Sequence, residues 1–247
     1  MQPAIEALPD KSALIERARA LVVEKVQAAI AQRGRCTLAL AGGSTPKPLY
    51  EALAQADLPN DQLYLFWGDE RYVPADHPDS NAKMVRESWL ERVDIPTENV
   101  FSVPTEAPSP AEAAHQYEQT LQQFFQTDGL PQFDVILLGM GDDGHTASLF
   151  PQTPVLQIQD RWVAVGEKAN QPRITLTAPL INQARNVIFL VSGANKQTAL
   201  SQVFSPHADA LTYPARLIRP AGNLYWLLDA AAAAGLPAQI DFEGTGE

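Results

Sequence analysis

The segment 139–151, GMGDDGHTASLFP, contains the histidine best suited to accept a proton. His145 follows the apolar run FDVILL (133–138), which predicts a buried strand. We expect a helix to begin here, and the positive end of a helix dipole disfavours an imidazolium and helps to keep the ring neutral. Asp142 and Asp143 act in the opposite direction, because nearby carboxylates favour the charged ring. A histidine at the end of a strand in this setting indicates a general base.

The same segment matches the dinucleotide-binding pattern G-x-G-x-x-G. In that pattern bare backbone N–H groups meet a pyrophosphate, and an acid such as Glu167 would bind the ribose. Asp142 and Asp143 would place negative charges in the turn that has to receive the pyrophosphate. The sequence therefore favours a catalytic role for His145, with a dinucleotide site as the alternative.

Three charged residues, Asp69, Glu70 and Arg71, directly follow the apolar run LYLFW (63–67). Charges in this position are typical of a solvated loop with ion pairs. They are also suited to chemistry, because an arginine at a strand end can bind phosphate through two hydrogen bonds or stabilise an oxyanion. Asp69 and Arg71 are therefore candidates for catalysis.

A glycine turn formed by Gly42, Gly43, Ser44 and Thr45 follows the apolar run CTLALA (36–41) and precedes a segment that its prolines can open as a helix. Glycines let the backbone approach a ligand, hydroxyl groups add donors, and a helix N-terminus favours an anion. The turn is thus a candidate phosphate site, although an ordinary strand-to-helix turn uses the same residues. The nucleotide pattern G-x-x-x-x-G-K-[ST] is not present.

Two cations are further candidates for binding phosphate. Lys196 lies in SGANK, after the apolar run NVIFLV, and Arg173 opens RITLTAPLIN. Such side chains are usually solvated, but we expect both to lie at the same edge as the glycine turn. The other histidines have no comparable setting, and we expect them at the surface; they are His77, His115 and His207.

The elements that must position these residues alternate between helices and short apolar runs. Residues 11–32 carry an apolar stripe at helical spacing, with Asp10 as N-cap and Gly34 just past the end. We expect further helices around 111–126 and 230–235, and a frayed tail after Leu236. Eight runs predict strands: CTLALA, LYLFW, VFSV, FDVILL, WVAVGE, RITLTA, NVIFLV and NLYWLL.

Runs that are apolar at successive positions are typical of strands buried on both faces of a parallel sheet. The predicted fold is α/β: a doubly wound, mostly parallel, Rossmann-like sheet with helices on both faces, forming one domain over residues 1–247. In such sheets, ligands bind beyond the carboxyl ends of the strands. All the candidate residues above follow or begin predicted strands, so we expect them to meet there.

Composition excludes several classes of protein. A net charge of −11 and a pI near 4.8 exclude nucleic acid and anionic membranes as the main partner. Cys36 is the only cysteine, so an intramolecular disulfide and a cysteine-rich zinc site are impossible. The N-terminal segment lacks the pattern of a signal peptide, and no run is long enough for a membrane span. We therefore expect a soluble, cytoplasmic protein.

Five motifs resemble, in the same order, those of 6-phosphogluconolactonases: AGGSTP, WGDERYVPADHPDSN, GMGDDGHTASLFP, PRITLTAPLIN and SGANK. The resemblance covers about residues 38–196 and departs only at Ala41, where threonine is frequent. It implies hydrolysis of 6-phospho-D-glucono-1,5-lactone in the oxidative pentose phosphate pathway, with no metal or cofactor. It also implies a fold similar to glucosamine-6-phosphate deaminases and ribose-5-phosphate isomerases.

The resemblance also implies roles for particular residues. His145 corresponds to the general base, and Asp69 with Arg71 to an important pair of opposite charge. The glycine turn, Arg173 and Lys196 are candidates for the phosphate, with Arg71 able to serve either end of the substrate. The substrate would be a phosphosugar lactone, and we expect a monomer, with a small homo-oligomer as the alternative.

Two other functions remain open from the sequence. Glucosamine-6-phosphate deaminases typically have DEY where this chain has Asp69, Glu70 and Arg71, and DGHIAFNEP where it has DGHTASLFP. The chain therefore lacks an acidic residue that the deaminase mechanism uses. A catalytically silent sugar-phosphate sensor is the third possibility, but no DNA-binding extension is evident in the sequence.

Overall fold

The long N-terminal helix α1 (Lys11–Arg33) begins and ends as the sequence predicts. In the computed structural model, which describes residues 2–236, the backbone N–H of Ala13 donates to the Asp10 carboxylate at 2.9 Å. At the other end, the N–H of Gly34 donates to the Ile30 carbonyl at 2.8 Å. The predicted apolar stripe faces the core: Ile30 is partly buried, and the other six residues are buried, namely Leu14, Ala18, Leu21, Val22, Val26 and Ala29.

Seven parallel strands form the main sheet, and the apolar runs predict six of them. Their spatial order is β1 (Ala4–Leu8), β10 (Asn223–Asp229), β9 (Asn186–Val191), β6 (Val135–Gly139), β2 (Cys36–Leu40), β3 (Leu63–Trp67) and β5 (Val100–Phe101). The sequence analysis missed β1, which is only partly buried because it lies at the edge of the sheet. From β2 the chain adds strands first on one side and later, from β6, on the other, so the topology switches between β2 and β6.

Two of the predicted strands are not part of the parallel sheet. The runs WVAVGE and RITLTA form β7 (Val163–Lys168) and β8 (Gln171–Leu176), which pair antiparallel with each other. The predicted loop at Asp69–Arg71 is the third strand, β4, and it pairs antiparallel with β8. This correction follows from packing: an apolar run predicts a strand without specifying which sheet the strand joins.

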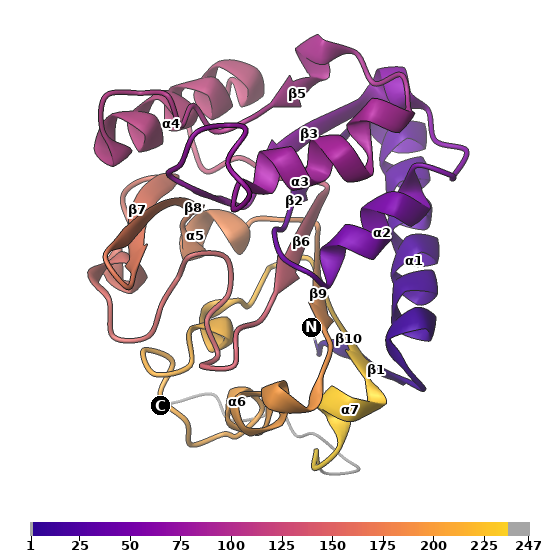
Figure 1. Ribbon diagram of the computed structural model, residues 1–247, viewed down its shortest axis with the longest axis vertical. Helices are drawn as coiled ribbons and strands as arrows, with labels where there is room; N and C mark the ends of the chain where they lie inside the picture. The colour runs from indigo at the N-terminus through magenta and orange to yellow at the C-terminus, as the bar shows by residue number, and fades with distance from the viewer. Residues whose placement is uncertain (1, 237–247) are drawn as a thin grey trace.

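Helices and the small sheet cover the two faces of the main sheet. In Figure 1, α1 and α2 (Pro46–Leu53) lie on one side, while the small sheet, α4 (Pro110–Phe125) and α5 (Ala178–Ile181) lie on the other. The remaining helices are α3 (Asn81–Ser88), α6 (Gln197–Val203) and α7 (Ala230–Ala233). The α/β fold class is confirmed, and the helices predicted around 111–126 and 230–235 are α4 and α7.

The buried core joins the layers. Cys36 is fully buried in β2, as expected for a cysteine in an apolar strand. Phe189 on β9 stacks on Trp226 on β10 with ring centroids 3.7 Å apart, and Phe204 packs edge-on against the same indole. No helix in residues 2–236 is long and apolar enough to cross a membrane. The tail predicted to fray after Leu236 lies outside the described residues.

Candidate active site

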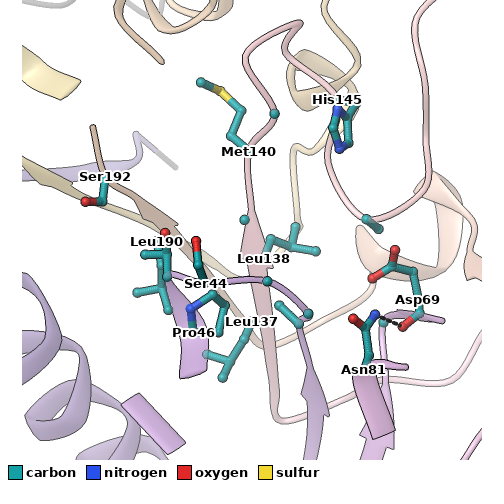
Figure 2. Close-up of a pocket in the computed structure, with 18 of the residues that line it drawn as sticks. Ser44, Pro46, Asp69, Asn81, Leu137, Leu138, Met140, His145, Leu190 and Ser192 are labelled. Carbon is teal, nitrogen blue, oxygen red and sulfur yellow. Dashed lines mark hydrogen bonds between the residues drawn. The ribbon is translucent and has the colours of Figure 1, made fainter. Parts of the chain in front are cut away.

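A cavity of about 360 Å³ opens at the carboxyl ends of β2, β6 and β9, which are neighbours in the sheet. The topology switch lies here, so the loops after these strands separate and leave a crevice between them. All nine residues predicted for the site line this cavity: Gly42, Gly43, Ser44, Thr45, Asp69, Arg71, His145, Arg173 and Lys196. In Figure 2, His145 and Asp69 lie on one side of the cavity, with Ser192 on the opposite side.

His145 lies in the loop after β6, and its imidazole is held by Asp143. Its Nδ1 is 2.5 Å from Oδ1 of Asp143, whose Oδ1 also accepts a hydrogen bond from the His145 backbone N–H at 3.1 Å. Burial opposes ionisation of this carboxyl, but the hydrogen bonds from His145 outweigh it and hold the pKa of Asp143 well below its usual value. An ionised Asp143 only accepts, so Nδ1 carries the proton and Nε2 is left as the basic nitrogen.

The helix expected after β6 is absent. The chain instead continues through turns and a single bridge between Thr146 and Leu149, so no helix dipole acts on His145. The dinucleotide alternative loses its support, because its pyrophosphate site requires the N-terminus of a helix directly after the strand.

Gly141 is required for the packing of His145 and Asp143, and not for the approach of a dinucleotide. A Cβ built at this position would lie 2.0 Å from Nδ1 of His145 and 2.6 Å from Oδ1 of Asp143. Both distances are far below van der Waals contact, so only glycine leaves room for the His145–Asp143 pair.

Two arginines, Arg71 on β4 and Arg173 on β8, are direct cross-strand partners at the edge of the cavity. Arg71 donates to the Asp79 carbonyl at 2.6 Å, and Arg173 donates to the Gln171 side chain at 3.2 Å. Within the described residues neither forms an ion pair, and the Nε atom of each is buried without a hydrogen bond. Burial and the charge of Arg71 lower the pKa of Arg173. Directly opposed like charges are unfavourable unless an anion binds between them.

Asp69 is buried beside these arginines. Its Oδ2 accepts a hydrogen bond from the Ser148 hydroxyl at 2.7 Å, and its carbonyl accepts one from the Asn81 side chain at 2.9 Å (Figure 2). Within the described residues no cation is paired with this carboxylate. Asp69 is therefore able to accept a hydrogen bond from a hydroxyl group in the cavity.

Glu70 has a supporting role that the sequence analysis did not assign. Its carboxylate accepts backbone N–H bonds from Arg71, Asn81 and Ala82 at 2.7–2.8 Å, which joins β4 to the start of α3. Burial raises the pKa of Glu70, although the three N–H donors favour its ionised form. The signal was present in the sequence, since Ser80 and Asn81 in the PDSN segment are residues that begin helices.

The glycine turn leads into α2, which begins at Pro46 as predicted. A Cβ at Gly42 would lie 1.9 Å from Oδ1 of Asn81, so glycine is required for this close approach. Oδ1 of Asn81 is buried, lies without a hydrogen-bond partner, and belongs to a residue that lines the cavity. The turn thus contributes backbone groups and the Ser44 side chain to the site, which is the arrangement expected of an oxyanion or phosphate site.

Lys196 ends the short 3-10 segment η5 (Ala194–Lys196), in the loop after β9. Asp229 positions this loop, because its carboxylate accepts from the Ser192 hydroxyl at 2.5 Å and from the Gly193 N–H at 3.1 Å. Burial opposes ionisation of Asp229, but these bonds and one from Ala232 lower its pKa. The sequence gives no sign of this contact, because β9 and β10 are neighbours only in the folded sheet.

Over residues 2–236, no cluster of three or more histidine, cysteine or acidic side chains is arranged to hold a metal ion. The remaining histidines lie away from the cavity. His115 and His207 are exposed, and His77 is partly exposed, in agreement with the predicted surface positions.

Comparison with known proteins shows the family of this chain. A family model described as glucosamine-6-phosphate isomerases/6-phosphogluconolactonase matches residues 9–226. The chain belongs to this family. The 6-phosphogluconolactonase of Nostoc sp. is 58% identical over 238 residues, which cover 96% of this chain and 99% of that relative. The human 6-phosphogluconolactonase is 38% identical, with 91% and 90% of the two chains covered.

Solved structures of the glucosamine-6-phosphate isomerase/6-phosphogluconolactonase family have the same fold. The 6-phosphogluconolactonase from Trypanosoma brucei superposes with a TM-score of 0.85 at 34% identity, covering 96% of this chain and 99% of that one. The one from Trypanosoma cruzi has a TM-score of 0.86 at 31% identity. The resemblance read from the five motifs and the fold class are therefore both confirmed.

Proposed function

We propose that this chain hydrolyses 6-phospho-D-glucono-1,5-lactone to 6-phospho-D-gluconate, with His145 as the general base. The observation that carries the proposal is that His145, held by Asp143, lines the same cavity as Arg71 and Arg173, two arginines without ion-pair partners in the described residues. A proton acceptor beside cationic groups that can bind a phosphate is what hydrolysis of a phosphorylated ester requires. The high identity to 6-phosphogluconolactonases over nearly the full length supports the same conclusion.

His145 moves the proton in both halves of the reaction. Nε2 removes a proton from a water molecule as the water oxygen attacks the lactone carbonyl carbon, and the carbonyl becomes a tetrahedral oxyanion. When the oxyanion collapses, the bond between that carbon and the ring oxygen breaks. The imidazolium returns its proton to the ring oxygen, which becomes a hydroxyl group. Asp143 stabilises the imidazolium between these two steps.

The phosphate is bound by Arg173, Lys196 and the glycine turn, with Arg71 between the phosphate and the lactone. Two guanidinium groups side by side favour a dianion strongly, because each can donate two hydrogen bonds and the anion removes their mutual repulsion. Asp69 accepts a hydrogen bond from a sugar hydroxyl and orients the ring. In this assignment the protein binds the phosphosugar without a cofactor, and it acts in the cytoplasm as the second enzyme of the oxidative pentose phosphate pathway.

A lactonase assay tests the proposal. Glucose-6-phosphate dehydrogenase generates the lactone, and we expect the protein to accelerate its loss above the spontaneous rate. We expect His145→Ala to lower kcat by roughly 100-fold or more, because a positioned general base contributes about that much. The affinity for 6-phosphogluconate, measured by calorimetry, should change little, since the protein groups that bind the phosphate are unchanged in this variant.

The matched control is His115→Ala, which removes an exposed histidine on α4. This variant should keep full activity. Wild-type protein that binds 6-phosphogluconate without accelerating lactone loss would indicate a sensor instead of an enzyme. Equal turnover by His145→Ala and wild type would contradict the role of His145.

A further inference from the structure

Asp143 has a second partner, Lys168. The Lys168 ammonium is 3.2 Å from Oδ2 of Asp143, while His145 occupies Oδ1. The two oxygens of one carboxylate therefore bind a lysine on one side and the imidazole on the other. Lys168 is the last residue of β7, directly before the tight turn at Ala169 and Asn170, so the small sheet determines where this ammonium lies.

The ring of Phe150 contacts both the His145 imidazole and the Lys168 ammonium. His145 packs on it with ring centroids 4.7 Å apart, and the Lys168 ammonium lies 5.3 Å from the Phe150 centroid. Phe150 is only 4% exposed, so its ring is buried beneath these polar groups. The contact with an aromatic face is itself attractive for a cation, which restricts Lys168 to the neighbourhood of Asp143.

We propose that Lys168 sets the proton affinity of His145 by neutralising part of the charge of Asp143. This inference rests on the proposed function, in which His145 must be neutral to accept a proton. Asp143 alone would stabilise the imidazolium and remove the base at neutral pH. A cation on the far oxygen weakens that effect while the hydrogen bond to Nδ1 remains. Lys168 is in this sense a positioning residue that acts through Asp143.

Other charged groups face the imidazole from the surrounding elements. They are Asp142 on the same loop, Asp69 and Arg71 on β4, Arg173 on β8 and Lys196 at η5, all of which line the cavity. Arg173 also lies over Phe150, at 5.7 Å from its centroid. These groups are the same in wild type and in a Lys168 variant, so a difference between the two reports the Lys168 charge.

The test compares Lys168→Met, Lys168→Arg and wild type. We expect Lys168→Met to move the acidic limb of the pH profile of kcat/KM to higher pH by about half a unit or more. A cation near a histidine opposes its protonation, so removing the cation makes protonation easier. Lys168→Arg should restore the wild-type limb. The matched control is Lys25→Met, which removes a lysine paired with Glu24 near the amino ends of β9 and β10, beside Asn186 and Asn223.

A second measurement does not depend on turnover. Proton NMR titration of the four histidines, with His145 assigned by its loss in His145→Gln, should give a higher His145 pKa in Lys168→Met than in wild type. An unchanged titration, or an activity loss with an unshifted pH profile, would overturn the inference and leave Lys168 with a purely structural role. Absence of lactonase activity in wild type would overturn the proposed function instead, while the titration still decides the role of Lys168.

Discussion

At the scale of single residues, the site is built from pairs in which one side chain restricts another. His145 is oriented by Asp143, Asp69 by Ser148, and the two arginines by the register of β4 and β8. Restricting a side chain in advance lowers the entropy lost when substrate binds. The arginines differ from the other pairs, because they carry like charges that repel each other and neither forms an ion pair in the described residues.

Arg71→Ala tests that difference. We expect a higher KM and a lower kcat, with kcat/KM reduced by roughly 10- to 100-fold, because a hydrogen bond to a charged ligand group contributes about 1.5–3 kcal/mol. Steady-state kinetics with the spontaneous rate subtracted measures both constants. Arg86→Ala, which removes a half-exposed arginine near Glu91, is the control and should change neither. Unchanged KM and kcat in Arg71→Ala would remove this residue from the site.

At the scale of elements, buried carboxylates attach the functional loops to the sheet. Glu70 binds the first N–H groups of α3, and Asp229, at the end of β10, binds both the start of α7 and the loop that carries Lys196. Each carboxylate satisfies backbone donors that the ends of elements leave unpaired. The segments around the cavity are therefore fixed by hydrogen bonds to the buried carboxylates of Glu70 and Asp229.

Asp229→Asn is expected to lower the free energy of unfolding by about 1–2 kcal/mol at pH 7, because bonds to a charged acceptor are lost. The pKa of folded Asp229 lies below its usual value of 3.8, so its ionised form stabilises the fold above that pH. The stabilisation is lost as the pH falls through the lower, folded value. The difference between variant and wild type should therefore shrink below about pH 4 in urea unfolding.

The control for this experiment is Asp160→Asn, whose side chain is 79% exposed. It should behave as wild type throughout the pH range. A constant difference between Asp229→Asn and wild type down to pH 2 would contradict a contribution from the charge of Asp229.

At the scale of the molecule, the two sheets share one buried core. Residues of the main sheet, the small sheet and the helices belong to a single hydrophobic cluster. The candidate cavity is lined by His145, from the loop after β6 of the main sheet, and by Arg71 and Arg173, from the small sheet. A core that is shared in this way predicts that the layers unfold together, which is also what a single domain requires.

Phe189→Ala tests this expectation, since Phe189 stacks on Trp226 in the main sheet, whereas β7 and β8 belong to the small sheet. We expect a loss of about 3–5 kcal/mol of unfolding free energy, as for other buried phenylalanines. Far-UV circular dichroism and lactonase activity, measured along the same urea series, should report one transition with one midpoint. Two separate midpoints would show that the small sheet unfolds independently.

The amino-acid sequence alone predicted six of the seven strands of the main sheet, the ends of α1 and nine of the residues that line the cavity. These follow from local signals: apolar runs, capping residues, and polar residues placed directly after strands. Their chemical roles remain predictions, because residue type and position along the chain do not define distances to a substrate.

Which strands become neighbours is defined only in the folded molecule. The runs that became β7 and β8 are apolar enough to predict strands, but an apolar run does not specify which sheet the strand joins. For the same reason the pairing of Arg71 with Arg173, the hold of Asp229 on the Lys196 loop, and the approach of Lys168 to Asp143 were not readable from the sequence. Each joins residues at least 25 positions apart along the chain, and such contacts form only when the whole core is assembled.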